Sequence, residues 1–73
     1  MSTLLTHVAE RIRDRRQSLG MTVRELAGKS GVSERFLVAL EGGKANVSVA
    51  RLAEVASALG LSMASLFPSE VSA

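Results

Sequence analysis

The sequence predicts a small all-α domain built from five short helices. Apolar residues recur at helical spacing along the chain, and no stretch shows the alternation of apolar and polar residues that is typical of a strand. Glycine or proline follows each helical segment and ends it. Since 73 residues suffice for one domain with one small core, we place the domain at residues 1–67 and a flexible tail or linker at 68–73.

The first two helices are predicted from their apolar faces and their ends. The first runs from about Leu4 to Leu19 and stops at Gly20. Its apolar face contains Leu5, Val8, Ala9, Ile12 and Leu19. The second starts at Thr22, which forms a capping box with Glu25, and ends at Gly31. Its apolar face contains Val23, Leu26 and Ala27.

Three further helices follow the same pattern. The third starts at Ser33, a good N-cap, and runs to Glu41. Its apolar face contains Phe36, Leu37 and Leu40. After a loop over 43–47, Ser48 caps a fourth helix that ends at Gly60. Its apolar residues are Val49, Leu52, Val55, Ala56 and Leu59. Ser62 caps a last short helix, which holds Met63, Leu66 and Phe67 before Pro68.

Composition argues against several classes of function. The chain has no cysteine and a single histidine, His7, so we expect no metal site and no cofactor. No nucleophile stands beside a base, and an enzyme is not expected. No apolar run approaches the roughly 18 residues that a membrane span needs, so we expect no membrane partner and a cytoplasmic location. The net charge is +2. The cluster of Arg11, Arg13, Arg15 and Arg16 is read as a solvated face unless a DNA-binding motif lies beside it.

The second and third helices carry the most informative pattern. A small residue, Ala27, stands where two steeply crossing helices meet, and Gly31 supplies the positive φ that a tight turn needs. Leu26, Val32, Leu37 and Leu40 are placed to face inward. This arrangement is that of a helix-turn-helix motif.

Three segments of the chain resemble the Cro/CI-type (XRE) helix-turn-helix family. They are residues 21–27 (MTVRELA), 30–33 (SGVS) and 40–44 (LEGGK). The fourth helix and the closing Leu66-Phe67 also fit, so the likeness covers nearly the whole chain. It implies a five-helix lambda-repressor-like domain, with the helix-turn-helix at helices two and three and recognition helix 33–41 in the major groove of double-stranded DNA. The expected function is sequence-specific transcriptional regulation, for example as a repressor.

The resemblance assigns base contacts to the third helix. Ser33, Glu34 and Arg35 occupy its N-terminus, and Arg35 can pair with guanine O6 and N7 in bidentate fashion. Glu34 can accept from cytosine N4 or position Arg35. Val38 and Ala39 lie one turn on, where an apolar side chain can contact only a thymine methyl, or simply permit close approach.

The resemblance assigns phosphate contacts to the residues around that helix. The backbone amides at Thr22 and Val23 open helix two, and a helix N-terminus attracts anions. The family often has glutamine at the position of Val23, so Arg24 is a candidate replacement. The further candidates are Lys44, Asn46 and Arg16. Arg16 aligns with a family arginine that also pairs with the glutamate at Glu41; a simple surface salt bridge is the alternative reading.

Three readings of the whole chain remain open. The first is a homodimer on an inverted repeat, joined through a C-terminal apolar surface of Leu61, Met63, Leu66 and Phe67. The loop at Asn46-Val47-Ser48 resembles that of the controllers of restriction–modification operons. The second is a DNA-binding domain of a longer regulator, with an effector domain or small-molecule ligand outside this chain. The third is an antitoxin-like protein-binding module. A Phe36 side chain that points to solvent favours this module, whereas one that packs inward favours DNA binding.

Overall fold

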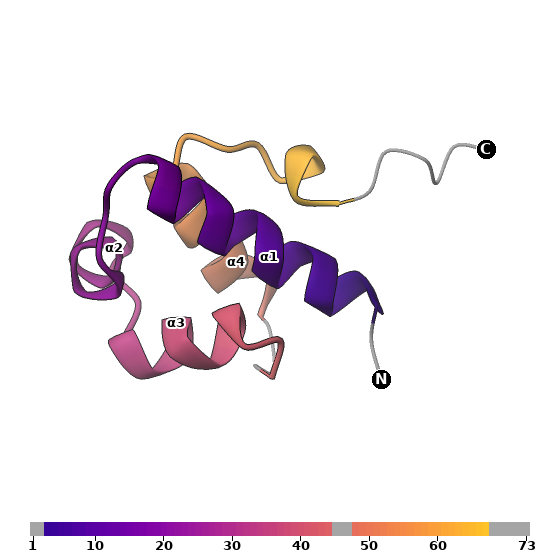
Figure 1. The fold of residues 1–73 in the computed structure, drawn as a ribbon, viewed down its shortest axis with the longest axis horizontal. Helices are drawn as coiled ribbons and strands as arrows, with labels where there is room; N and C mark the ends of the chain where they lie inside the picture. Colours follow the sequence, from indigo (N-terminus) through magenta and orange to yellow (C-terminus); the bar gives the residue numbers. More distant parts are fainter. Residues whose placement is uncertain (1–2, 45–47, 68–73) are drawn as a thin grey trace.

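Four α-helices and one short 3-10 turn make up the computed structural model, which describes residues 3–44 and 48–67 (Figure 1). In chain order they are α1 (Thr3–Ser18), α2 (Val23–Ser30), α3 (Glu34–Glu41), α4 (Val49–Ala58) and η1 (Ala64–Leu66). The all-α prediction is confirmed, but the prediction of five helices is wrong. The fifth element is a single 3-10 turn of three residues, because Phe67 already has extended backbone angles and Pro68 follows it. The predicted tail at 68–73 lies outside the described residues.

Serine and threonine caps define where three of the helices begin. The Thr22, Ser33 and Ser48 side chains accept hydrogen bonds from the amides of Glu25, Phe36 and Arg51, respectively. At Thr22 the capping box is complete, since the Glu25 carboxylate accepts from the Thr22 amide at 2.8 Å. Thr22 and Ser33 are therefore caps and not the first helical residues, and the recognition helix spans 34–41 rather than 33–41.

A single apolar core lies between the four helices. Its buried members come from every element and from the turn before α3: Val8, Ala9, Ile12, Leu26, Ala27, Val32, Leu37, Leu40, Leu52, Val55, Ala56, Leu59 and Leu66. No polar or charged residue is fully buried among the described residues. The apolar faces predicted from helical spacing are thus largely confirmed.

Leu19 and Val49 are the two exceptions to those predicted faces. Leu19 is 46% exposed because α1 ends at Ser18 and the chain turns away at Gly20. Val49 is 73% exposed because it is the first residue of α4, whose buried stripe begins one turn later at Leu52. Both residues stand at helix ends, where helical spacing no longer decides which side faces the core.

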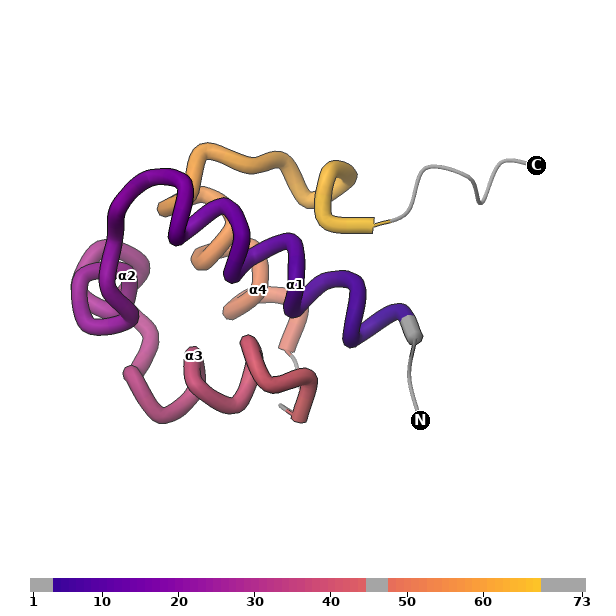
Figure 2. Tube along the Cα trace, viewed as in Figure 1, coloured from indigo at the N-terminus to yellow at the C-terminus, as the bar shows by residue number. Residues whose placement is uncertain are grey.

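Helix α1 crosses the middle of the molecule and separates α3 from the C-terminal turn (Figure 2). It packs against α3 on one side and against η1 on the other, while α2 packs against both α3 and α4. In this view α3 and η1 lie at opposite edges. The recognition helix and the C-terminal segment therefore present separate surfaces.

Arginines of α1 attach the C-terminal segment to the rest of the fold. Arg15 Nε donates to the Leu59 carbonyl at 3.0 Å, and Arg11 Nε donates to the Ser65 carbonyl at 3.2 Å. Arg16 is engaged with α3, as described below. Three of the four arginines in this cluster thus bond carbonyls or a carboxylate of the protein itself. The solvated-face reading was conditional on the absence of a neighbouring DNA-binding motif, and it does not describe these three side chains.

Candidate nucleic-acid interface

The turn between α2 and α3 has the geometry that the helix-turn-helix pattern predicts. Gly31 ends α2 in the left-handed conformation, with φ of 81°, and its amide donates to the Ala27 carbonyl at 2.9 Å. Val32 follows as a buried residue, and Ser33 then caps α3. Leu26 and Ala27 of α2 and Leu37 and Leu40 of α3 are buried in one cluster. These contacts fix the angle at which α3 projects.

The first turn of α3 exposes the side chains predicted to read bases. Ser33, Glu34 and Arg35 are all exposed. The Ser33 oxygen accepts from the Phe36 amide at 3.0 Å, so its capping role leaves the hydroxyl hydrogen available. One turn on, Val38 is 62% exposed and Ala39 is half-buried. The five residues thus form an exposed strip along α3 that is polar at its start and apolar at its end.

The predicted phosphate contacts border this strip at both ends. Arg24 and Lys44 are exposed, and Arg24 Nε lies 4.0 Å from the Glu34 carboxylate, a loose pair between α2 and α3. The capping box already engages the Thr22 and Glu25 amides, which leaves those of Val23 and Arg24 as the donors at the start of α2. Lys44 follows α3, and its amide donates to the Ala39 carbonyl at 2.9 Å. Asn46 lies outside the described residues.

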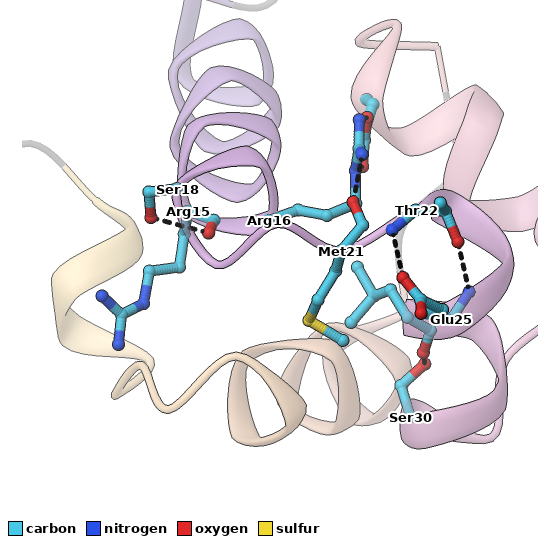
Figure 3. Close-up of polar contacts among 9 residues, drawn as sticks. Arg15, Arg16, Ser18, Met21, Thr22, Glu25 and Ser30 are labelled. Carbon is cyan, nitrogen blue, oxygen red and sulfur yellow. Dashed lines mark hydrogen bonds and ion pairs between the residues drawn. The ribbon is translucent and has the colours of Figure 1, made fainter.

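Arg16 and Glu41 form a bidentate ion pair between α1 and the end of α3. Arg16 Nε and Nη2 donate to the two Glu41 oxygens at 2.7 and 2.9 Å. Arg16 Nη1 also donates to the Met21 carbonyl at 2.8 Å (Figure 3). The side chains are only 12% and 9% exposed. The hydrogen bonds and charge of Glu41 raise the pKa of Arg16, against the opposing effect of burial. The predicted pairing is confirmed, and the pair is largely buried rather than a solvated surface bridge.

The predicted dimer surface is only partly available in the monomer. Leu66 is fully buried in the core, where its side chain cannot contact a second molecule. Leu61, Met63 and Phe67 are half-buried and pack around the same core. The η1 turn of this segment packs against α1 on the side away from α3 (Figure 1).

Within residues 3–44 and 48–67 the structure offers no group of three metal-ligating His, Cys, Asp or Glu side chains. None of the helices in this part of the chain has the length and apolar character needed to cross a membrane.

Comparison with known proteins decides the family. A model described as Helix-turn-helix matches residues 12–66. The chain belongs to the helix-turn-helix family. The resemblance to Cro/CI-type proteins is thereby confirmed, and so is the prediction of a DNA-binding regulatory domain.

Individual helix-turn-helix proteins agree with this assignment. The chain is 43% identical over 47 residues to an uncharacterized HTH-type transcriptional regulator, y4dJ, of Sinorhizobium fredii, and this match spans 64% of the chain and 61% of that relative. The clp gene regulator ClgR from Corynebacterium glutamicum is 40% identical with a TM-score of 0.81, covering 89% of this chain and 83% of that one. The restriction–modification controller C.Esp1396I, as a tetramer with its 35 base-pair operator, is 27% identical with a TM-score of 0.82, covering 90% and 87%.

Sequence reasoning missed the tertiary roles of three arginines. Arg11 and Arg15 bond carbonyls 54 and 44 residues away, which no local pattern reveals. Arg51 of α4 lies over the ring of Phe36, with its Cζ 5.8 Å from the ring centroid. Arg51 lies in the first turn of α4, where the helix dipole disfavours a positive charge. This unfavourable position is the sequence signal that could have singled it out.

Proposed function

We propose that this chain binds duplex DNA sequence-specifically as a homodimer on an inverted repeat and so regulates transcription in the cytoplasm. The observation that carries the proposal is the exposed strip on α3, which is held outward by a buried α2–α3 packing. Two copies of α3, spaced one helical turn or about 34 Å apart, would enter successive major grooves on one side of the duplex.

The residues of the strip and those that border it make two classes of contact. Arg35 reads a base, since its guanidinium is exposed at the start of α3 and can donate two hydrogen bonds to guanine. Val38 offers its exposed methyl groups to a thymine methyl. Arg24, Lys44 and the first amides of α2 hold phosphates on either side, which positions the helix without reading sequence. Arg16 acts indirectly, because its ion pair with Glu41 fixes the end of α3.

The position of Phe36 supports DNA over a protein partner as the main target. A protein-binding module needs an apolar patch on this face, and an outward Phe36 would have provided it. Phe36 instead packs against the core and is only half-exposed. Charged and polar residues occupy the exposed positions before it.

Two substitutions test the division between base and phosphate contacts. Binding is measured by fluorescence anisotropy on a selected operator and on a scrambled duplex, over a range of salt concentrations. Arg35→Ala should cost about 1–3 kcal/mol on the operator and relax the preference at one base pair. Lys44→Ala should weaken binding to both duplexes and lower the salt slope by about one unit. An equal loss on both duplexes for Arg35→Ala would refute its assignment to a base.

The proposed dimer surface has its own test. Replacing Phe67, which is half-buried as are Leu61 and Met63, by serine should convert the dimer to a monomer in sedimentation equilibrium. Helical circular dichroism should remain, because the fully buried Leu66 still anchors η1. An unchanged dimer would place the contact elsewhere.

A further inference from the structure

We propose that Arg51, stacked on the ring of Phe36, is an additional phosphate-contacting residue that extends the DNA interface from α2 and α3 onto α4. The inference rests on the proposed function and names a residue outside the helix-turn-helix. Phe36 acts as its positioning residue.

The stacking places the Arg51 guanidinium beside the recognition helix. Its Cζ lies 5.8 Å from the centroid of the Phe36 ring, within the range of a cation–π contact. Phe36 directly follows Arg35 in α3 and packs against the core, so the ring is a fixed support. The Ser48 side chain accepts from the Arg51 amide at 3.2 Å and fixes the backbone as well.

Arg51 differs from Arg11, Arg15 and Arg16 of α1 because its side chain has no hydrogen bond or ion pair to an oxygen atom of the described residues. Arg11, Arg15 and Arg16 all donate to oxygen atoms of the protein. No carboxylate forms an ion pair with Arg51 in the part of the chain that the structure describes, and the first turn of α4 has no acidic residue. Arg51 is exposed, so its positive charge remains available to an external anion.

The geometry favours a phosphate over a base edge. The ring of Phe36 covers one face of the planar guanidinium, while its N–H edges, which match two phosphate oxygens, remain free. Arg51 comes from α4 and not from the helix that enters the groove. It therefore meets the sugar–phosphate backbone that flanks the groove, and its contribution is independent of base sequence.

The test compares Arg51→Ala with a cation removed from elsewhere on the surface. Lys29 is the matched control, because it is exposed in the last turn of α2, at the end opposite Arg24. Affinity and salt slope are measured on the operator and on a scrambled duplex, and thermal melting confirms that each variant folds. Arg51→Ala should bind both duplexes about tenfold more weakly and lower the salt slope by about one unit. Lys29→Ala should match the wild type.

Two further variants separate the charge of Arg51 from its stacking. Arg51→Lys should retain the salt slope but lose part of the affinity, since an ammonium lacks the planar fork. Phe36→Leu should weaken binding in the wild type but not further in Arg51→Ala, because the ring acts through the arginine. Additive losses in the double variant would overturn the positioning role of Phe36.

Failure of this inference is distinguishable from failure of the proposed function. If wild-type protein binds the operator specifically while Arg51→Ala behaves as Lys29→Ala does, the Arg51 assignment is wrong and the function stands. A loss confined to the operator would also overturn the phosphate assignment. If the wild type shows no preference for any duplex, the proposed function itself fails.

Discussion

The Arg16–Glu41 pair offers the sharpest test of how the recognition helix is held. Truncation by Arg16→Ala removes three hydrogen bonds of 2.7 to 2.9 Å and takes the cation away from Glu41, whose side chain is 9% exposed in the intact pair. Breaking a buried pair by removing one partner costs about 3–5 kcal/mol. Since the pair retains some solvent contact, we expect about 3 kcal/mol. Glu41 also ends α3, where a negative charge opposes the helix dipole.

Thermal melting by circular dichroism measures this effect directly. For a domain of this size, 1 kcal/mol shifts Tm by about 4–8 °C, so Arg16→Ala should lower Tm by about 12–24 °C. Arg13→Ala is the matched control, because Arg13 lies on the same helix without a hydrogen bond or ion pair to another described residue. If Arg16→Ala melts within about 4 °C of Arg13→Ala, as a solvated pair would, the reasoning is refuted.

A double variant and a pH series complete the test. Replacing both partners by apolar residues, as in Arg16→Met with Glu41→Leu, should recover much of the lost stability, because no buried charge is left unpaired. Glu41 raises the pKa of Arg16 above its ordinary value. The stabilisation by Arg16 is therefore complete below that ordinary value and is lost only as pH rises through the raised one, so it should stay constant across neutral pH.

Two more predictions concern the turn and the cap. Gly31→Val should lower the free energy of unfolding by about 2 kcal/mol or more in denaturant titrations, because a branched side chain is strained at a φ of 81°. Gly28→Ala should instead raise it by about 1 kcal/mol, since Gly28 is helical and an added Cβ meets nothing within 4 Å; equal effects would contradict the turn argument. Ser33→Asp should keep the cap and the melting temperature but weaken DNA binding by charge repulsion, whereas Ser33→Ala should cost about 1 kcal/mol of stability. Retained affinity in Ser33→Asp would place the start of α3 away from DNA.

The motif could be predicted from sequence because its determinants are local. The capping box at Thr22 and Glu25 and the left-handed Gly31 act within a few residues of chain. Because these caps and this glycine fix the local backbone conformation, the predicted helix ends lie within one or two residues of the observed ones. Helical spacing is also local, and it predicts correctly which residues of α2 and α3 face the core.

The contacts that complete the fold could not be predicted in this way. The Arg15 bond to the Leu59 carbonyl depends on how α1 packs against a segment 44 residues away. Leu66 is predicted to lie in a dimer surface, since the sequence alone does not distinguish an apolar residue that packs in its own core from one that contacts a second subunit. Only the packing of η1 against α1 shows that this side chain is buried.

Selection of bound fragments from a random DNA pool near physiological salt, followed by sequencing, is the decisive test of sequence-specific recognition by α3. We expect enrichment of an inverted repeat with half-sites about one helical turn apart. The same selection with Arg35→Ala should lose preference at one position in each half-site. Salt-sensitive retention of DNA without an enriched sequence would contradict sequence-specific recognition by α3.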